Sequence, residues 1–227
     1  MITTLFAATT FACSLAASPV TGSRAPTGTP AAQDAATSDS VYRALFESGQ
    51  AFADFVARAD HRKEQWEANY ALRATPDALV TRAKAAGSGW RLLVVTVPGC
   101  SDSVNSIPYL ASLVDQLPGV EMRLVMRDAG LSVMEAHRTP DGRAATPTVI
   151  LLDAEFNERG CWIERPAPLI AWLDGQKGKM RDGELFDGKM KWYDDDRGAS
   201  SLEELVQMME AAAAGRVFCG SGAPGQP

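Results

Sequence analysis

The chain has 227 residues, of which 46% are hydrophobic, and its formal net charge is −6 at pH 7. This hydrophobic content supplies a core and excludes an intrinsically disordered chain, while the length suits one domain with tails. Lys and Arg residues are scattered along the chain, which argues against a nucleic-acid partner because such partners need clustered positive charge.

The N-terminus is predicted to be a targeting segment. Residues 2–17 are apolar and small, and Ala16-Ala17-Ser18 suits a cleavage site, so residues 1–18 are interpreted as a signal peptide. No Lys or Arg precedes the apolar stretch, which departs from an ordinary signal. A lipoprotein signal anchored at Cys13 is the second interpretation, and a cytosolic tail is the third. We therefore expect an exported, periplasmic or extracytoplasmic protein that contacts a membrane only through a lipid on Cys13, with a cytoplasmic protein as the alternative.

Residues 19–40 are rich in Pro, Gly, Ser, Thr and Ala and predict a flexible linker. Residues 41–215 predict the folded domain, and residues 216–227 predict a loose tail. Within the domain, apolar periodicity and turn residues predict the following elements in chain order. They are helices over 41–58, 61–72 (helix or turn) and 75–87, a strand over 90–97, a helix over 104–117, a strand over 120–126, a helix over 131–136, strands over 148–152 and 161–163, a helix over 168–173, a Gly- and Lys-rich connector over 175–198 and a final helix from residue 200. This order predicts a layered α/β domain.

Cys100 is the most informative residue because it lies between a predicted strand and a predicted helix. The free N–H groups and the macrodipole at a helix N-terminus favour a thiolate over a thiol, so Cys100 is a candidate nucleophile. Ser103 lies three residues further on, on the same helix face, and its hydroxyl is expected to donate a hydrogen bond to the sulfur. Asp102 adds negative charge, which opposes the thiolate slightly.

Five short motifs follow one another along the domain. They are Gly99-Cys100-Ser101-Asp102-Ser103 with Pro108 further on, Arg127-Asp128 at a strand end, Thr146-Pro147-Thr148, Gly160-Cys161-Trp162 followed by Arg165-Pro166, and Lys191-Trp192-Tyr193. Together they resemble the thioredoxin-like superfamily, in the bacterial branch with a helical extension before the first core strand. The resemblance implies a central mixed sheet flanked by helices and a cis peptide bond before Pro147. Two positions depart from the family pattern, because Gly99 replaces a tryptophan and Ser103 stands where many relatives have a second cysteine.

A C-x-x-S site has no resolving thiol, so it can attack a disulfide and hold a mixed disulfide but cannot form a disulfide of its own. The resemblance therefore implies monothiol thiol–disulfide exchange or isomerase-like activity on protein or small-molecule thiols and disulfides. The residues it assigns are Cys100, Ser103 and Pro147 for catalysis and Thr146, Gly99, Ser101 and Asp102 for the substrate groove. The alternative is a redox-inactive binding module on the same fold. No cofactor and no metal site are predicted, because the cysteine spacings do not suit zinc.

The remaining cysteines are expected to play a structural part. In the fold that the resemblance implies, the last helix runs back and brings Cys219 near Cys161, so a Cys161–Cys219 disulfide is expected, with Cys100 left free. Two unpaired thiols are the alternative. His137 is expected on the surface, and Arg165 is expected to pair with Asp128 or to assist an anion.

Overall fold

The computed structural model describes residues 30–220, with side chains described from residue 39 onward. The predicted signal peptide, the candidate lipid-anchor residue Cys13 and part of the predicted linker lie outside the described residues. Within the described part of the chain, no helix combines the length and the apolarity that crossing a bilayer requires.

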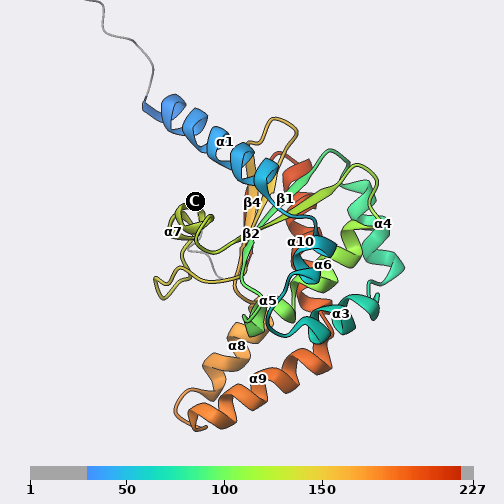
Figure 1. Cartoon of the computed structure of the whole chain (residues 1–227), viewed down its shortest axis with the longest axis vertical. Coiled ribbons are helices and arrows are strands. Elements are labelled where there is room, and N and C mark those ends of the chain that lie inside the picture. Colours follow the sequence, from blue (N-terminus) through green and yellow to red (C-terminus); the bar gives the residue numbers. More distant parts are fainter. Residues whose placement is uncertain (1–29, 221–227) are drawn as a thin grey trace, which may run out of the picture.

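Five strands form one mixed sheet at the centre of the domain (Figure 1). The strands are β1 (Arg91–Thr96), β2 (Glu121–Met126), β3 (Thr148–Leu152), β4 (Glu158–Ile163) and β5 (Phe218–Gly220). Their spatial order is β2-β1-β3-β4-β5. β1 pairs in parallel with β2 and antiparallel with β3, and β4 pairs antiparallel with β3 and in parallel with β5. This sheet confirms the predicted α/β class with a central mixed sheet.

Helices cover both faces of the sheet. They are α1 (Pro30–Ser48), α2 (Phe52–Ala57), α3 (Lys63–Ala71), α4 (Asp77–Ala85), α5 (Ser101–Val104), α6 (Ile107–Val114), α7 (Leu131–Ala136), α8 (Ala167–Gln176), α9 (Asp182–Asp196) and α10 (Ala199–Ala213). One hydrophobic cluster joins the sheet to α2, α3, α4, α6 and α10, and a second cluster joins the opposite face to α1 and α7.

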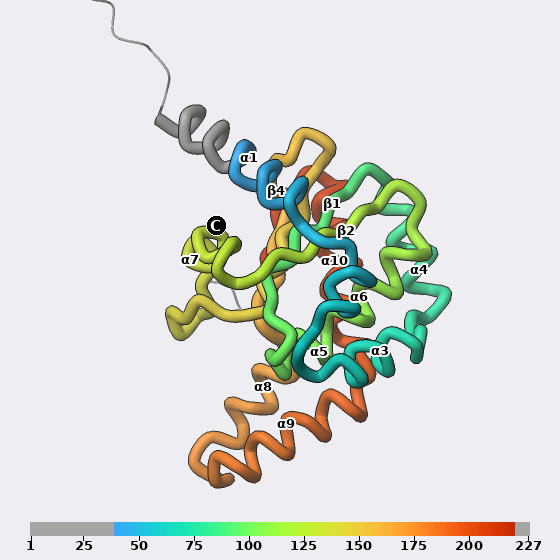
Figure 2. The backbone as a smooth tube through the Cα atoms, viewed as in Figure 1, coloured from blue at the N-terminus to red at the C-terminus, as the bar shows by residue number. Residues whose placement is uncertain are grey.

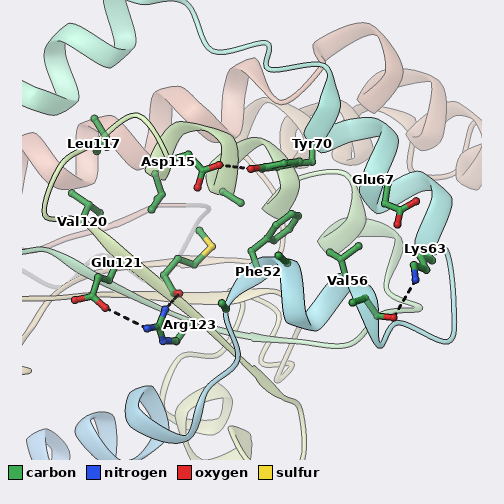
Figure 3. Close-up of a pocket in the computed structure, with 16 residues that line it drawn as sticks. Phe52, Val56, Lys63, Glu67, Tyr70, Asp115, Leu117, Val120, Glu121 and Arg123 are labelled. Carbon is green, nitrogen blue, oxygen red and sulfur yellow. Dashed lines mark hydrogen bonds and ion pairs between the residues drawn. The ribbon is translucent and has the colours of Figure 1, made fainter.

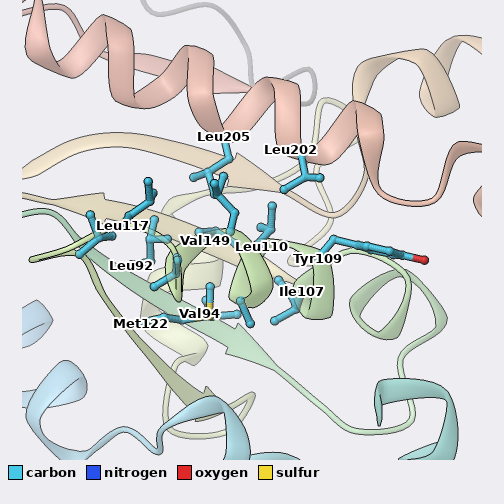
Figure 4. Packing of buried hydrophobic residues seen from close by; sticks show 14 of the residues in the cluster. Leu92, Val94, Ile107, Tyr109, Leu110, Leu117, Met122, Val149, Leu202 and Leu205 are labelled. Atoms are coloured by element: carbon cyan, nitrogen blue, oxygen red, sulfur yellow. The ribbon is translucent and has the colours of Figure 1, made fainter. Parts of the chain in front are cut away.

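The alternation of side chains along β1 divides the core between these two clusters. Leu92 and Val94 belong to the first cluster, whereas Leu93 and Val95 belong to the second. All four side chains are fully buried, which is why this strand reads as a continuous apolar run in the sequence. Figure 4 shows Leu205 of α10 directed toward the strand residues of the first cluster.

The first predicted helix, over residues 41–58, is divided in two. α1 begins inside the predicted linker and ends at Ser48, and α2 begins only at Phe52. Between them, Gln50 exchanges two backbone hydrogen bonds of 2.8 Å with Leu124 of β2. This pairing to the edge of the sheet engages backbone groups that a continuous helix would need, and it therefore breaks the helix.

The predicted connector over residues 175–198 is largely helical. α9 occupies most of it and packs against α8, so that the two helices form an arm at one end of the domain (Figure 2). Arg181 and Glu184 form a capping box at the start of α9. Lys189 and Tyr193, which are four residues apart and share one helix face, are buried. Tertiary contacts of that face outweigh the helix-weakening glycines of this segment.

The start of the predicted tail forms β5. Its three residues extend the sheet beside β4, and Cys219 lies directly opposite Cys161 in the register. The two cysteines form a disulfide, which confirms the expected pairing, and among the described residues Cys100 is the only cysteine that remains free. Gly160 permits this close pairing, because a Cβ atom there would lie 2.6 Å from the carbonyl oxygen of Phe218.

Replacing Gly160 with alanine is therefore expected to push β5 away from β4 and to lower the free energy of unfolding by about 1–3 kcal/mol, the usual cost of overpacking. Urea denaturation of both proteins measures the change. Gly183→Ala is the matched control, because no atom outside the glycine's chain neighbours and the local backbone of α9 lies within 4 Å of the added Cβ. The control should be neutral or stabilising by at most about 1 kcal/mol. Equal stability of the two variants would contradict the steric argument.

Candidate active site

The chain turns sharply between β1 and α5, and Cys100 lies at that turn. Cys100 is the N-cap residue of α5, and its sulfur accepts a hydrogen bond of 3.4 Å from the backbone N–H of Ser103. Cys100 is partly exposed as a residue, whereas the strand that precedes it is buried.

The loop that enters β3 faces the same sulfur. The peptide bond between Thr146 and Pro147 is cis, and the carbonyl oxygen of Thr146 lies 3.2 Å from the Cys100 sulfur, whose S–H donates to it. The next carbonyl, that of Pro147, accepts a hydrogen bond of 2.7 Å from the backbone N–H of Glu164. The structure thus brings Cys100 together with Thr146 and Pro147, which follow it by more than forty residues in the sequence.

Ser103 does not contact the sulfur in the expected way. Its side chain is fully buried, and within the described part of the chain its hydroxyl has no hydrogen-bond partner. Only the backbone N–H of Ser103 reaches the Cys100 sulfur, so the expected hydroxyl–sulfur hydrogen bond is wrong. Ser103 therefore contributes to the site through its backbone and through the absence of a second thiol.

A buried charge cluster lies behind the cysteine turn and is centred on Asp102. The Asp102 carboxylate accepts hydrogen bonds from the Lys189 ammonium at 3.1 and 3.2 Å and from the Tyr193 hydroxyl at 2.9 Å. It also pairs with the Arg165 guanidinium at 3.3 and 3.4 Å. Burial, and next the charge of Asp102, raise the pKa of Tyr193 well above its usual value, so this hydroxyl stays protonated and donates. Two cations thus balance the carboxylate, and its expected opposition to a thiolate is offset.

Sequence reasoning did not find this cluster. Arg165 is expected to pair with Asp128 or to assist an anion, whereas its guanidinium contacts the Asp102 and Glu164 carboxylates. In the sequence, Tyr193 is recognised only as part of a family motif, and no role is predicted for Lys189. A lysine and a tyrosine four residues apart in a predicted connector were the available signal, because that spacing places both on one helix face.

A family model described as Thioredoxin matches residues 49–179. The chain belongs to the thioredoxin family. No curated protein is similar enough to count as a match. Among solved structures, a protein of unknown function from Pseudomonas aeruginosa is 24% identical, covers 75% of this chain and 98% of its own, and superimposes with a TM-score of 0.58. An HIV epitope scaffold is 22% identical with the same coverage and a TM-score of 0.57. At these identities the two structures share the fold alone.

In this thioredoxin-family protein, side chains from α3 and the preceding loop hold the loop before the cysteine. Trp66 donates its indole N–H to the carbonyl oxygen of Pro98 at 3.0 Å, and the Nε–H of Arg62 donates to the carbonyl oxygen of Gly99 at 3.1 Å. A Cβ atom at position 99 would meet His61 only at an ordinary contact distance of 3.7 Å. Packing around the backbone therefore does not by itself exclude a Cβ atom at this position.

One cavity lies away from the cysteine turn. It has a volume of about 680 Å³ and lies between α2–α3 and α6–β2, with Phe52 at its centre, Lys63 at one end and Arg123 at the other (Figure 3). None of the residues assigned to catalysis or to the substrate groove lines it.

One group of side chains has the composition of a metal site. A ring nitrogen of His137, a carboxylate oxygen of Glu158 and the sulfur of Cys161 all lie within 4.8 Å of one another. The sulfur is bonded to Cys219, and a disulfide sulfur lacks the thiolate character that a metal ligand needs. The expectation of a surface histidine is wrong, since the His137 side chain is only 11% exposed.

Replacing Lys189 with methionine should leave Asp102 with one cation fewer in a buried setting. We expect the free energy of unfolding to fall by about 2–3 kcal/mol, at the lower end for a broken buried pair because Arg165 still faces the carboxylate. Thermal or urea denaturation measures the loss. The control is Lys191→Met, two residues further along α9, whose ammonium pairs with Asp195 at the solvent-exposed surface and should change stability little. Equal effects of the two substitutions would show that the Asp102 cluster does not hold α9 in place.

Proposed function

We propose that this protein carries out monothiol thiol–disulfide exchange with Cys100 as the nucleophile. The supporting observation is the placement of a partly exposed, unpaired sulfur 3.2 Å from the Thr146 carbonyl oxygen, beside the cis bond to Pro147. Membership of the thioredoxin family supports a thiol–disulfide role in general. The monothiol character follows from Ser103, which cannot act as a resolving thiol.

The reaction consists of two exchange steps. The Cys100 thiolate attacks one sulfur of a substrate disulfide, forms a new sulfur–sulfur bond and releases the other substrate sulfur as a thiolate. A second thiol, from the substrate or from a small molecule, then attacks the mixed disulfide and releases Cys100 as a thiolate. No net electrons are gained or lost by the enzyme over the cycle. The backbone N–H of Ser103 points at the reacting sulfur throughout and stabilises its negative charge.

The residues around the sulfur would bind the chain that carries the substrate disulfide. Thr146 and Pro147 form one side, and Gly99, Ser101 and Asp102 form the cysteine turn on the other. Ser101 is held in place by the Lys189 ammonium, which lies 3.0 Å from its hydroxyl oxygen. The Asp102 side chain is buried, so Asp102 acts on the cysteine turn indirectly, through the same lysine. These residues position the substrate and the turn, whereas Cys100 alone exchanges bonds.

Mass spectrometry of the protein after incubation with glutathione disulfide or with a disulfide-bonded peptide tests the proposal. We expect one mixed disulfide per chain, mapped to Cys100, and none on the Cys100→Ser variant. Ser103→Cys supplies the missing resolving thiol and should lower the accumulated mixed disulfide at least about tenfold, because attack within the site is far faster than attack from solution. Ser103→Ala is the matched control and should accumulate the adduct as the parent protein does. No adduct on folded protein, with free reaction after unfolding, would instead identify a redox-inactive binding module.

We also propose that the protein is exported. The apolar N-terminal segment supports this, and so does the Cys161–Cys219 disulfide, since stable disulfides are typical of oxidising compartments. Intact mass measurement of the protein from its own cells should show loss of about the first eighteen residues, in an extracytoplasmic fraction. A lipid on Cys13 would favour the lipoprotein alternative. A full-length cytoplasmic protein with both cysteines reduced would contradict export.

A further inference from the structure

The Cys161–Cys219 disulfide forms part of the wall of a second cavity, separate from the Cys100 site. The cavity has a volume of about 380 Å³, which lies within the usual range for small-molecule sites. The end of α7, the loop that follows it and Ile163 of β4 provide the rest of the wall, and the loop contributes His137 and Arg138. Cys161 is only 1% exposed, whereas Cys219 is partly exposed. A small thiol entering the cavity therefore has better access to the Cys219 sulfur.

The two sulfur atoms also differ in their neighbours. Cys161 lies next to His137, with a ring nitrogen and the sulfur within 4.8 Å of each other. The His137 ring is fixed, because Nδ1 lies 2.8 Å from the Val133 carbonyl oxygen and Nε2 lies 2.9 Å from a Glu158 carboxylate oxygen. Both partners accept hydrogen bonds, so both ring nitrogens carry hydrogen and the ring is an imidazolium.

The charges around His137 support this protonation state. Burial opposes the charged ring, but the hydrogen bond and the charge of Glu158 outweigh burial and raise the pKa of His137. The other Glu158 oxygen accepts a hydrogen bond from the Tyr42 hydroxyl of α1, which engages the carboxylate on its far side. Arg138 is paired with Glu135 at the mouth of the cavity, so these two charges balance each other.

We propose that the Cys161–Cys219 disulfide is a second exchange site, at which a low-molecular-weight thiol attacks Cys219 and Cys161 leaves beside the His137 imidazolium. The attacking thiolate forms a bond to the Cys219 sulfur, the bond between the two cysteines breaks, and its electron pair goes to the Cys161 sulfur. The thiol is thereby oxidised to a mixed disulfide, and the protein disulfide is reduced by one thiol equivalent. His137 acts as a positioning residue that stabilises the leaving thiolate, since exchange is faster when the leaving group is a better thiolate.

The Cys100→Ser variant allows the site to be tested without the other thiol. The protein is incubated with reduced dithiothreitol, and new thiols are trapped with iodoacetamide and counted by mass spectrometry. His137→Gln in this background should slow the reduction roughly three- to fivefold, because the rate of exchange follows only part of a change of about one unit in the pKa of the leaving thiol. Arg138→Gln is the matched control, because Arg138 lines the same cavity and its replacement leaves the His137 imidazolium in place. The disulfide of this variant should be reduced at the parent rate. If His137 only held the fold together, its replacement would loosen β5 and speed the reduction.

The position of attack provides a second readout. Short incubation with reduced glutathione under trapping conditions should place the glutathione adduct on Cys219 and the trapped alkyl group on Cys161. The rate of reduction should be independent of urea below the unfolding transition, because the attack takes place on the folded protein. Adducts on Cys161, a rate that follows global unfolding, or an unchanged or faster His137→Gln variant would overturn the proposal. Each of these outcomes leaves the reactivity of Cys100 unaffected.

Discussion

The buried Asp102 carboxylate holds together three parts of the chain that are remote in sequence. It lies on α5, immediately after the cysteine turn, and its donors come from α9 and from the turn after β4. A carboxylate removed from water is costly unless its lone pairs are engaged, and here an ammonium, a hydroxyl and a guanidinium engage them. The same lysine binds the Ser101 hydroxyl, so the position of the cysteine turn and the position of the arm are set by one cluster. The arrangement of the site therefore depends on a polar contact rather than on hydrophobic packing alone.

Much of the frame was predictable because its signals are local. The apolar run of β1, the turn at Cys100 and the Thr146–Pro147 strand entry each follow from a short stretch of sequence. The Asp102 cluster was not predictable in this way, because Lys189 is 87 residues away from Asp102 in the sequence. The pairing of the two residues depends on how the arm formed by α8 and α9 folds back onto the domain. α9 was missed because its glycines and lysines resemble a connector, and the partner that buries one of its faces cannot be seen in composition. β5 was missed because three residues carry too little periodicity to predict a strand.

The two sulfur centres differ in the way the fold presents them. Cys100 is unpaired and a backbone N–H is directed at its sulfur, so the exchange proposed for it depends on an incoming disulfide. The Cys161–Cys219 pair is already oxidised, with His137 next to the Cys161 sulfur, so the exchange proposed for it depends on an incoming thiol. Cys100 lies at the turn before α5, whereas Cys161 and Cys219 lie within the paired strands β4 and β5. Reaction at one does not require reaction at the other, and neither needs a third cysteine to complete an elementary exchange step.

Ser103 shows why packing does not explain the single-thiol site. Its buried hydroxyl has no partner among the described residues, and burying an unsatisfied hydroxyl costs about 1–3 kcal/mol. A cysteine thiol at the same place would lose less, since a thiol is a small, weakly polar group that is often fully buried. The interior around position 103 therefore favours sulfur over oxygen. The consequence of the oxygen is chemical instead, because in the proposed exchange Ser103 cannot resolve a mixed disulfide on Cys100.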